Sequence, residues 1–401
     1  MVFKTSSSAS RLARPHFPSE DDNASPSVVR AKSNLERSVY CIQGIPIDAI
    51  DVATVAENIE AAAIRGEAFV LSTPNLNFLA TSLLDPAFRE SVLASDLCPP
   101  DGIPLIWIAQ LLGLPIKQRA AGADLLDCLH LKNNGRRLSI FLFGGAKGVA
   151  AEAAAKINAR AGYLSCVGSL DPGYRDVSEM STDQIIETIN SSGADFLVLS
   201  LGAKKGQLWL QRNHDRLTIP VRSHLGAAMN FQAGVLTRAP PIVRTLGFEW
   251  LWRIKEERYL WKRYRNDGFV LLRLLFTRVL PLAALGRWQQ MKWKQQVKTL
   301  LIERTQELDG IKIKLCGTAS ESHISEATSC FRELLADKHN ILIDLEATRW
   351  IDARFFGLLL MLRKELKCRG RILALTGASR RIKRLFRLNE LEFLLKAENG
   401  S

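Results

Sequence analysis

The sequence lacks the motifs that most directly assign a nucleotide or hydrolytic chemistry. It has neither a G-x-x-x-x-G-K-[ST] loop nor a G-x-G-x-x-G fingerprint, which disfavours both a P-loop nucleotidase and a dinucleotide-dependent enzyme. No G-x-S-x-G element or Cys–His signature supports a hydrolase. Residues 37–240 also contain no D-x-D, so they offer no obvious carboxylate pair for a metal-bound diphosphate.

Cysteine is scarce and scattered. Seven cysteines without a C-x-x-C and six histidines without an H-x-x-x-H give no zinc pattern and no disulfide framework. We therefore expect reduced thiols in a cytosolic protein, with no metal and no cofactor. The cysteines are Cys41, Cys98, Cys128, Cys166, Cys316, Cys330 and Cys368.

Long uncharged apolar runs are missing as well. No apolar core follows the first residues, and no stretch of about 18 uncharged apolar residues occurs, so we expect neither a secretory signal nor a membrane-spanning helix. The net charge of +13 favours an anionic partner, which could be nucleic acid, a phosphorylated ligand or anionic lipid.

Four segments differ in composition. Residues 1–36 are rich in Ser, Pro and charge, which predicts disorder. Residues 37–240 alternate short apolar runs with longer helical ones, which is typical of a Rossmann-like, mainly parallel α/β sheet with helices on both faces. Residues 241–306 form a basic, Trp-rich appendage and linker. Residues 307–399 again alternate strands and helices and predict a second, smaller α/β domain.

The informative loops of residues 37–240 are those that follow predicted strands, because ligands bind at the carboxyl ends of parallel strands. Gly144 and Gly145 in "FGGAKG" and Gly202 in "LGAKKGQ" would let backbone N–H groups approach a phosphate, or they form only tight turns. Thr73 and Asn75 in "STPN" could orient a sugar or phosphate, or make an ordinary polar turn. His224 reads as a packed residue rather than a ligand.

Asp101 in "CPPDG" has two interpretations. It precedes the helical stretch "IPLIWIAQLLG", so its carboxylate could cap that helix. Alternatively, it could act as a general base on an acceptor hydroxyl.

The appendage combines many Arg and Lys with tryptophans such as Trp250, Trp252 and Trp261. This is either a solvated helical face or an interfacial membrane anchor. Residues 268–285 are apolar but interrupted by Arg273, Arg278 and Pro281, which suits a helix lying in the interface. An apolar stretch has no use on a phosphate backbone, so a membrane surface is favoured over nucleic acid.

Several ordered motifs resemble the WecG/TagA/CpsF glycosyltransferase family over residues 38–265. They are "TPNLNFL", "ASDLCPPDGIPLIW", "QRAAGADLL", "IFLFGGAKGVAAEAA", "INSSGADFLVLSLGAKKGQLWL" and "AGVLTRAPPIVRTLGFEWLWR". The resemblance implies an inverting, metal-independent transfer of an N-acetylmannosamine-like hexose from a UDP-sugar to a polyprenyl-diphosphate-linked saccharide. The place of action would be the inner face of the cell membrane, in cell-surface polysaccharide synthesis.

The resemblance also implies roles for individual residues. Asp101, followed by Gly102, would be the general base. Thr73, Asn75 and Gln207 would position the donor. The glycine turns would hold the diphosphate together with arginines before and within the appendage, namely Arg119, Arg238, Arg253 and Arg263.

Two positions depart from the family pattern. The usual Gln of P-K-Q-E is Gly206, with Gln207 following it, and the usual acid of F-D-F is Asn230. Both departures bear on the donor sugar and leave the expected base in place.

The C-terminal part resembles a STAS domain through "NILIDLEATRWIDARFFGLLLMLRKEL". The loop that carries a phosphorylated Ser in that family reads Asp352, Ala353, Arg354 here, so a phosphorylation switch is not expected, while docking of a protein partner is. The other interpretation of the whole chain is a non-catalytic scaffold that binds a nucleotide sugar and acts through this STAS-like domain.

Overall fold

The computed structural model describes residues 33–132, 136–245, 247–293, 299–307 and 310–396. Most of the segment predicted to be disordered, residues 1–32, lies outside the described residues. Its last residues form a 3-10 turn, Asn34–Glu36, whose Leu35 is buried. Regular structure therefore begins slightly before the expected boundary at residue 37.

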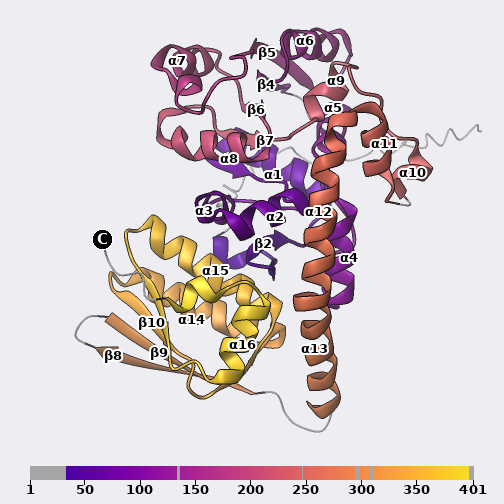
Figure 1. Ribbon diagram of the computed structural model, residues 1–401. Helices are drawn as coiled ribbons and strands as arrows, with labels where there is room; N and C mark the ends of the chain where they lie inside the picture. Colours follow the sequence, from indigo (N-terminus) through magenta and orange to yellow (C-terminus); the bar gives the residue numbers. More distant parts are fainter. Residues whose placement is uncertain (1–32, 133–135, 246, 294–298, 308–309, 397–401) are drawn as a thin grey trace, which may run out of the picture. The chain divides into compact units, whose positions relative to one another are not determined.

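A five-stranded parallel sheet forms the centre of the first part, in the order β3-β7-β6-β4-β5 (Figure 1). This confirms the predicted α/β class. The strands are β3 (Phe69–Leu71), β4 (Leu138–Gly144), β5 (Leu164–Leu170), β6 (Phe196–Ser200) and β7 (Val221–His224).

Both faces of this sheet are covered, because successive strand residues point to opposite sides. Ile140 and Leu142 pack with α1, α5, α6 and α9, whereas Phe141 and Phe143 pack with α7 and α8. The helices are α1 (Val52–Arg65), α5 (Gly122–Leu131), α6 (Val149–Ala159), α7 (Asp183–Ser191), α8 (Ala203–Arg212) and α9 (Ala228–Gln232).

Local capping residues set the ends of two helices of this part. Helix α1 ends at Gly66, which adopts a left-handed φ of 65° that few other residues tolerate. Helix α3 (Pro86–Leu93) begins after Asp85, whose carboxylate accepts the Phe88 N–H at 3.1 Å.

An antiparallel hairpin of β1 (Val39–Ile42) and β2 (Ile45–Asp48) was not predicted. Its turn uses Gln43 and Gly44, both at positive φ. Tyr40 and Ile42 pack with α2 (Leu76–Leu84), α3 and α4 (Ile103–Leu111) in a separate core.

The appendage is helical. It comprises α10 (Pro241–Thr245), α11 (Glu249–Glu256), α12 (Trp261–Leu274) and α13 (Leu280–Trp293). Helices α12 and α13 continue in line through a π-helical turn at Leu275–Val279 (Figure 1). The turn lies just before Pro281, which lacks the N–H needed for a regular α-helical bond.

By length and composition alone, residues Arg258–Gln289 could cross a membrane, although the sequence pattern predicted no membrane-spanning helix. One side of this helix nevertheless packs against the rest of the protein. Leu274 and Val279 are buried in the core shared with the hairpin, and Asp267 is buried too.

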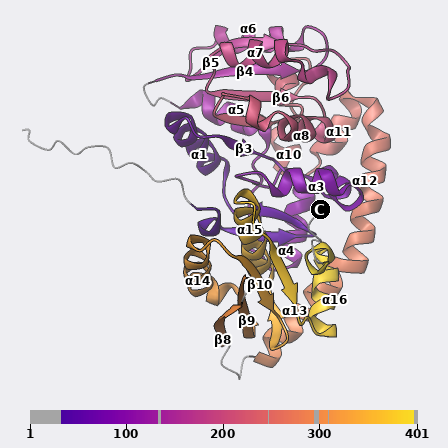
Figure 2. The same ribbon diagram turned by 90° about the vertical axis from the view of Figure 1, so that its left-hand side faces the viewer.

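The C-terminal part has a second five-stranded sheet, ordered β11-β9-β10-β12 with β8 antiparallel to β9. Helices of this part pack on it around a core rich in Leu and Phe (Figure 2). The elements are β8 (Leu300–Glu307), β9 (Gly310–Ala319), β10 (Asn340–Asp344), β11 (Thr348–Ile351), β12 (Leu373–Thr376), α14 (Ile324–Ala336), α15 (Ala353–Cys368) and α16 (Arg380–Leu388).

Candidate functional site

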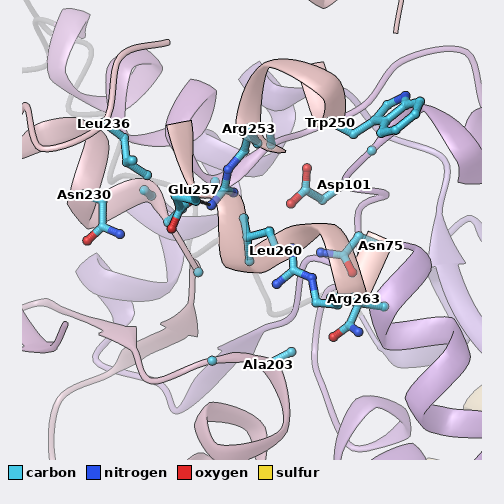
Figure 3. Close-up of a pocket in the computed structure, with 18 of the residues that line it drawn as sticks. Asn75, Asp101, Ala203, Asn230, Leu236, Trp250, Arg253, Glu257, Leu260 and Arg263 are labelled. Carbon is cyan, nitrogen blue, oxygen red and sulfur yellow. Dashed lines mark hydrogen bonds and ion pairs between the residues drawn. The ribbon is translucent and has the colours of Figure 1, made fainter. Parts of the chain in front are cut away.

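A cavity of about 1290 Å³ opens at the carboxyl ends of the parallel strands. The loops after β3, β4, β6 and β7 form its floor, and α11 with the start of α12 forms the opposite wall. Figure 3 shows Arg253 and Glu257 of the appendage between Asn230 on one side and Asp101 and Asn75 on the other. The volume of the cavity is more than sufficient for a nucleotide sugar.

Asp101 lies in this cavity, at the end of a turn held by backbone bonds. Its N–H donates to the Pro74 carbonyl at 2.7 Å, and the Ala120 N–H donates to the Pro100 carbonyl at 2.7 Å. The N-cap of α4 is Gly102, at φ 105°, and no side chain caps the helix. The capping interpretation of Asp101 is therefore wrong, and the carboxylate remains directed toward the cavity (Figure 3).

The surroundings of Asp101 favour its protonated form. Desolvation by the cavity walls raises its pKa to about 7, with Glu249 and Asp124 adding repulsion. Arg119 and Arg253 act in the opposite direction and lower the pKa. The result is a carboxyl group that titrates near neutrality, as a general base should.

Most of the predicted binding residues also line the cavity. The loop after β3 contributes Thr73 and Asn75, and the Asn75 side-chain oxygen caps α2 by accepting the Phe78 N–H at 3.1 Å. The remaining lining positions among those predicted are Gly102, Arg119, Gly145, Gly202, Asn230, Arg238, Arg253 and Arg263.

Two predicted binding residues do not line it. Gln207 is buried, and its side-chain amide donates to the Ser72 hydroxyl at 2.7 Å, so it links α8 to the residue that follows β3. At Gly144, a Cβ would lie 2.7 Å from the Ser200 carbonyl oxygen, so this glycine serves the close approach of β4 and β6. We correct both assignments from ligand binding to packing.

The cavity arginines differ in their ion pairs. Arg119 pairs with Glu249 at 2.5 Å, Arg238 with Asp124 at 2.6 Å, and Arg253 with Glu257. Arg263 has no ion pair within the described parts of the chain, and its guanidinium lies 5.0 Å from the Tyr264 ring centre. It is the arginine best prepared to meet an incoming anion.

His224 fills the space that the unusual Gly206 leaves open. A Cβ at Gly206 would lie 2.3 Å from the His224 Cδ2 atom, so no larger residue fits beside this ring. Burial lowers the pKa of His224 to about 4, which keeps it neutral. Its Nε2 is buried and has no hydrogen-bond partner among the described residues, although the residue borders the cavity. The glycine at position 206, which departs from the family pattern, is therefore explained by the packing of the His224 ring against it.

This coupling predicts a non-additive pair of substitutions. Gly206→Ala should lower the free energy of unfolding by about 1–3 kcal/mol through overpacking, and His224→Ala in the same chain should remove most of that loss. Chemical denaturation of both single variants and the double variant measures the coupling. Gly286→Ala is the control, because nothing lies within 4 Å of its Cβ position and Ala favours a helix. Additive effects would contradict the packing explanation.

Several residues of the site were not predicted from the sequence. Glu249, Glu257 and Asp267 are acids in a segment rich in Arg and Lys, and this contrast is the only sequence feature that marks them. Burial raises the pKa of Asp267, which accepts a hydrogen bond from Asn77 at 3.3 Å. Trp107, on α4, lines the cavity and is partly exposed to solvent.

The fold and cavity define an α/β protein with an arginine-lined ligand crevice at the carboxyl ends of a parallel sheet. Residues 40–284 match the glycosyl transferase WecG/TagA/CpsF family, so the chain belongs to that family and is a glycosyltransferase. Residues 300–399 match the STAS domain.

A curated relative supports this assignment. The chain is similar to the N-acetylglucosaminyldiphosphoundecaprenol N-acetyl-beta-D-mannosaminyltransferase of Bacillus spizizenii. The two are 25% identical over 199 residues, which is 50% of this chain and 75% of the relative.

Proposed function

We propose that the protein is an inverting glycosyltransferase that moves an N-acetylmannosamine-like hexose from a UDP-sugar to a polyprenyl-diphosphate-linked saccharide. The observation that carries the proposal is the Asp101 carboxylate, which caps no helix and has a pKa of about 7, in a cavity lined by arginines. The relative's name, which specifies a mannosaminyl group and a diphosphoundecaprenol, supports the substrate class.

In this mechanism, Asp101 takes the proton of an acceptor hydroxyl as that oxygen attacks the anomeric carbon. The bond from the anomeric carbon to the diphosphate oxygen breaks, and its electron pair leaves with UDP. Attack from the face opposite the diphosphate inverts the anomeric configuration. Arg263 would neutralise the charge that develops on the leaving group, and no metal ion is required in this proposal.

Thr73 and Asn75 would position the donor beside the base. The Asn75 side-chain oxygen caps α2, so its amide nitrogen is the group available to a ligand. The backbone at Gly145 and Gly202 allows close approach of the diphosphate. Asn230, on the other side of the cavity, would contact the sugar or the nucleotide.

The acceptor would enter from the lipid side. Exposed aromatic residues at the cavity edge, among them Trp107, Trp250 and Tyr259, suit a lipid-linked saccharide. We therefore place the protein at the inner face of the cell membrane as a peripheral protein. An acceptor screen tests the function: UDP-sugars are offered with a polyprenyl-diphosphate saccharide, and no transfer from any of them would favour the scaffold interpretation.

The pKa of Asp101 predicts opposite pH effects on activity and stability. Because the base must be ionised, kcat/KM should rise as the pH passes through about 7. The pKa is raised on folding, so the ionised group costs stability, and this cost grows as the pH rises from about 4 through about 7. Asp101→Asn should therefore raise Tm at pH 8 and leave it nearly unchanged at pH 4. An equal effect at both pH values would contradict the raised pKa.

Membrane binding should depend on one stripe of the long helix. Phe269, Leu272 and Phe276 are exposed and follow helical spacing, with Arg273 beside them. Replacing both phenylalanines by Asp should weaken binding to phosphatidylglycerol-containing vesicles by at least about tenfold.

Vesicle flotation measures this loss. The matched control replaces two exposed apolar residues elsewhere, Ile64 and Leu131, by Asp. It should float like the wild type. Unchanged flotation of the Phe269→Asp, Phe276→Asp variant would exclude this stripe as the anchor.

A further inference from the structure

Helix α15 of the STAS-like part is built against the glycosyltransferase part. Most of its residues are buried, including Arg354, Arg363 and Lys364. A Cβ at Gly357 would lie 2.1 Å from the Val39 carbonyl oxygen, so the helix touches the backbone of β1 directly. Figures 1 and 2 show α15 next to the hairpin.

Arg354 lies in the first turn of α15 and makes a fixed contact with the segment around β1. Its guanidinium donates to the Arg37 carbonyl at 3.1 Å and the Val39 carbonyl at 3.2 Å. The Asp352 carboxylate caps α15 by accepting the Phe355 N–H at 2.8 Å. The first turn of α15 therefore holds the start of β1 and the residues just before it.

Lys364 reaches the segment between α3 and the Cys98–Asp101 turn. Its ammonium group donates to the Ser95 carbonyl at 2.9 Å and to Asp96 Oδ1 at 2.6 Å. The other oxygen of Asp96 accepts the Val70 N–H at 2.9 Å, which ties the same segment to β3. A buried ammonium with three acceptors is strongly held, and its third acceptor is the Asn34 side chain at 3.2 Å.

Arg37 and Asp48 extend this contact to the turn itself. Arg37 donates to the Ser95 carbonyl at 3.2 Å and pairs with both carboxylate oxygens of Asp48, at 2.7 and 3.2 Å. Asp48 accepts the Cys98 N–H at 2.6 Å, and the Asp48 N–H donates to the Cys98 carbonyl at 2.9 Å. Two buried prolines then lead from Cys98 to Asp101, which leaves this backbone little freedom.

We propose that α15 is a positioning element for catalysis: through Lys364, Arg37 and Asp48 it holds the Cys98–Asp101 turn, and with it the carboxylate of Asp101. The inference rests on the proposed role of Asp101 as the base. It gives the STAS-like part a function inside its own chain, in place of docking a separate protein on this face.

Lys364→Met in the full-length protein tests the proposal, because Met keeps the apolar stem and removes the charge. A displaced base costs rate, so kcat should fall about tenfold while KM for the UDP-sugar changes less than twofold. Lys364→Arg should restore most of kcat. Arg304→Met is the control, since it removes an exposed ion pair with Asp337 within the STAS-like part, and it should match the wild type.

The pH profile distinguishes positioning from general loss of structure. Arg119 and Arg253 face Asp101 as cations, and Glu249 and Asp124 face it as anions. The lysine substitution leaves all four in place. A loosened turn admits water and lowers the pKa of Asp101, so the acid limb of kcat/KM should move below its wild-type position. A variant that is merely less stable would keep the limb where it is.

Hydrogen exchange gives a readout that does not depend on activity. Amides of residues 95–101 should exchange about tenfold faster in the lysine variant, and the Arg304→Met protein should keep wild-type protection. If Lys364→Met does not fold, Asp96→Asn weakens the same contact from the other side and should change both measurements in the same direction.

The two proposals can fail separately. Full transfer by an Asp101→Asn protein would remove the base assignment, while exchange of the turn would still report whether α15 holds it. A folded Lys364→Met protein with wild-type kcat, pH profile and exchange would overturn the positioning role.

Discussion

Asp101→Asn should lower kcat for sugar transfer by about 10²–10⁴-fold. The amide has nearly the shape of the carboxyl group but cannot take the acceptor proton. UDP binding should change little, because the role assigned to Asp101 concerns the acceptor hydroxyl. Initial rates with a lipid-linked acceptor, together with calorimetric binding of UDP, measure the two effects.

The matched control is Asp51→Asn. Asp51 caps α1 with its carboxylate, accepting the Thr54 N–H at 2.8 Å, and it lies away from the cavity. Asn is an equally good cap, so this variant should transfer sugar at the wild-type rate. Retention of more than about a tenth of wild-type kcat by Asp101→Asn would refute a general base that contributes 10²-fold or more.

Arg263→Met should lower kcat about 10²–10³-fold, the size expected for losing one charge at the departing group. We select Arg263 for substitution because the other predicted cavity arginines form ion pairs within the protein. Arg238, for example, also holds Asp127 at 2.9 Å, so its removal would disturb α5 as well. Arg263 makes no ion pair among the described residues and acts on the buried Asp267 only as a nearby charge, so its loss should change Tm less than the loss of Arg238.

Arg265→Met is the control for the arginine experiment. Arg265 lies on the same helix, is exposed, and stacks at 4.7 Å from the Trp261 ring centre outside the cavity. Both variants lose one positive charge, so a difference between them reports the position of the charge. Equal rates in the two variants would show that Arg263 does not meet the leaving group.

Local chemistry made much of the fold predictable from the sequence. Gly66 ends α1 and Asp85 begins α3 through backbone preferences that act within a few residues. The alternation of apolar runs predicted the parallel sheet, and the family motifs located the Asp101 turn. These features depend on neighbours in sequence, which is why a single sequence reveals them.

Properties that depend on distant contacts were not predictable. Gln207 stands beside a glycine turn in the sequence, yet its side chain points to Ser72 because α8 turns that face inward. The Gly206–His224 packing joins residues from two elements. Glu249 meets Arg119 only because the appendage folds back over the strand ends.

The hairpin strand β1 contributes to two cores at once. Tyr40 and Ile42 face the glycosyltransferase helices, whereas Val39 and Cys41 face the STAS-like part. During synthesis, one side of this early strand can be covered soon after it emerges. Its other side stays open to water until the last hundred or so residues have been made. A chain released before that point would expose the apolar side chains of Val39 and Cys41, and such an exposed surface is a target for chaperones and proteases.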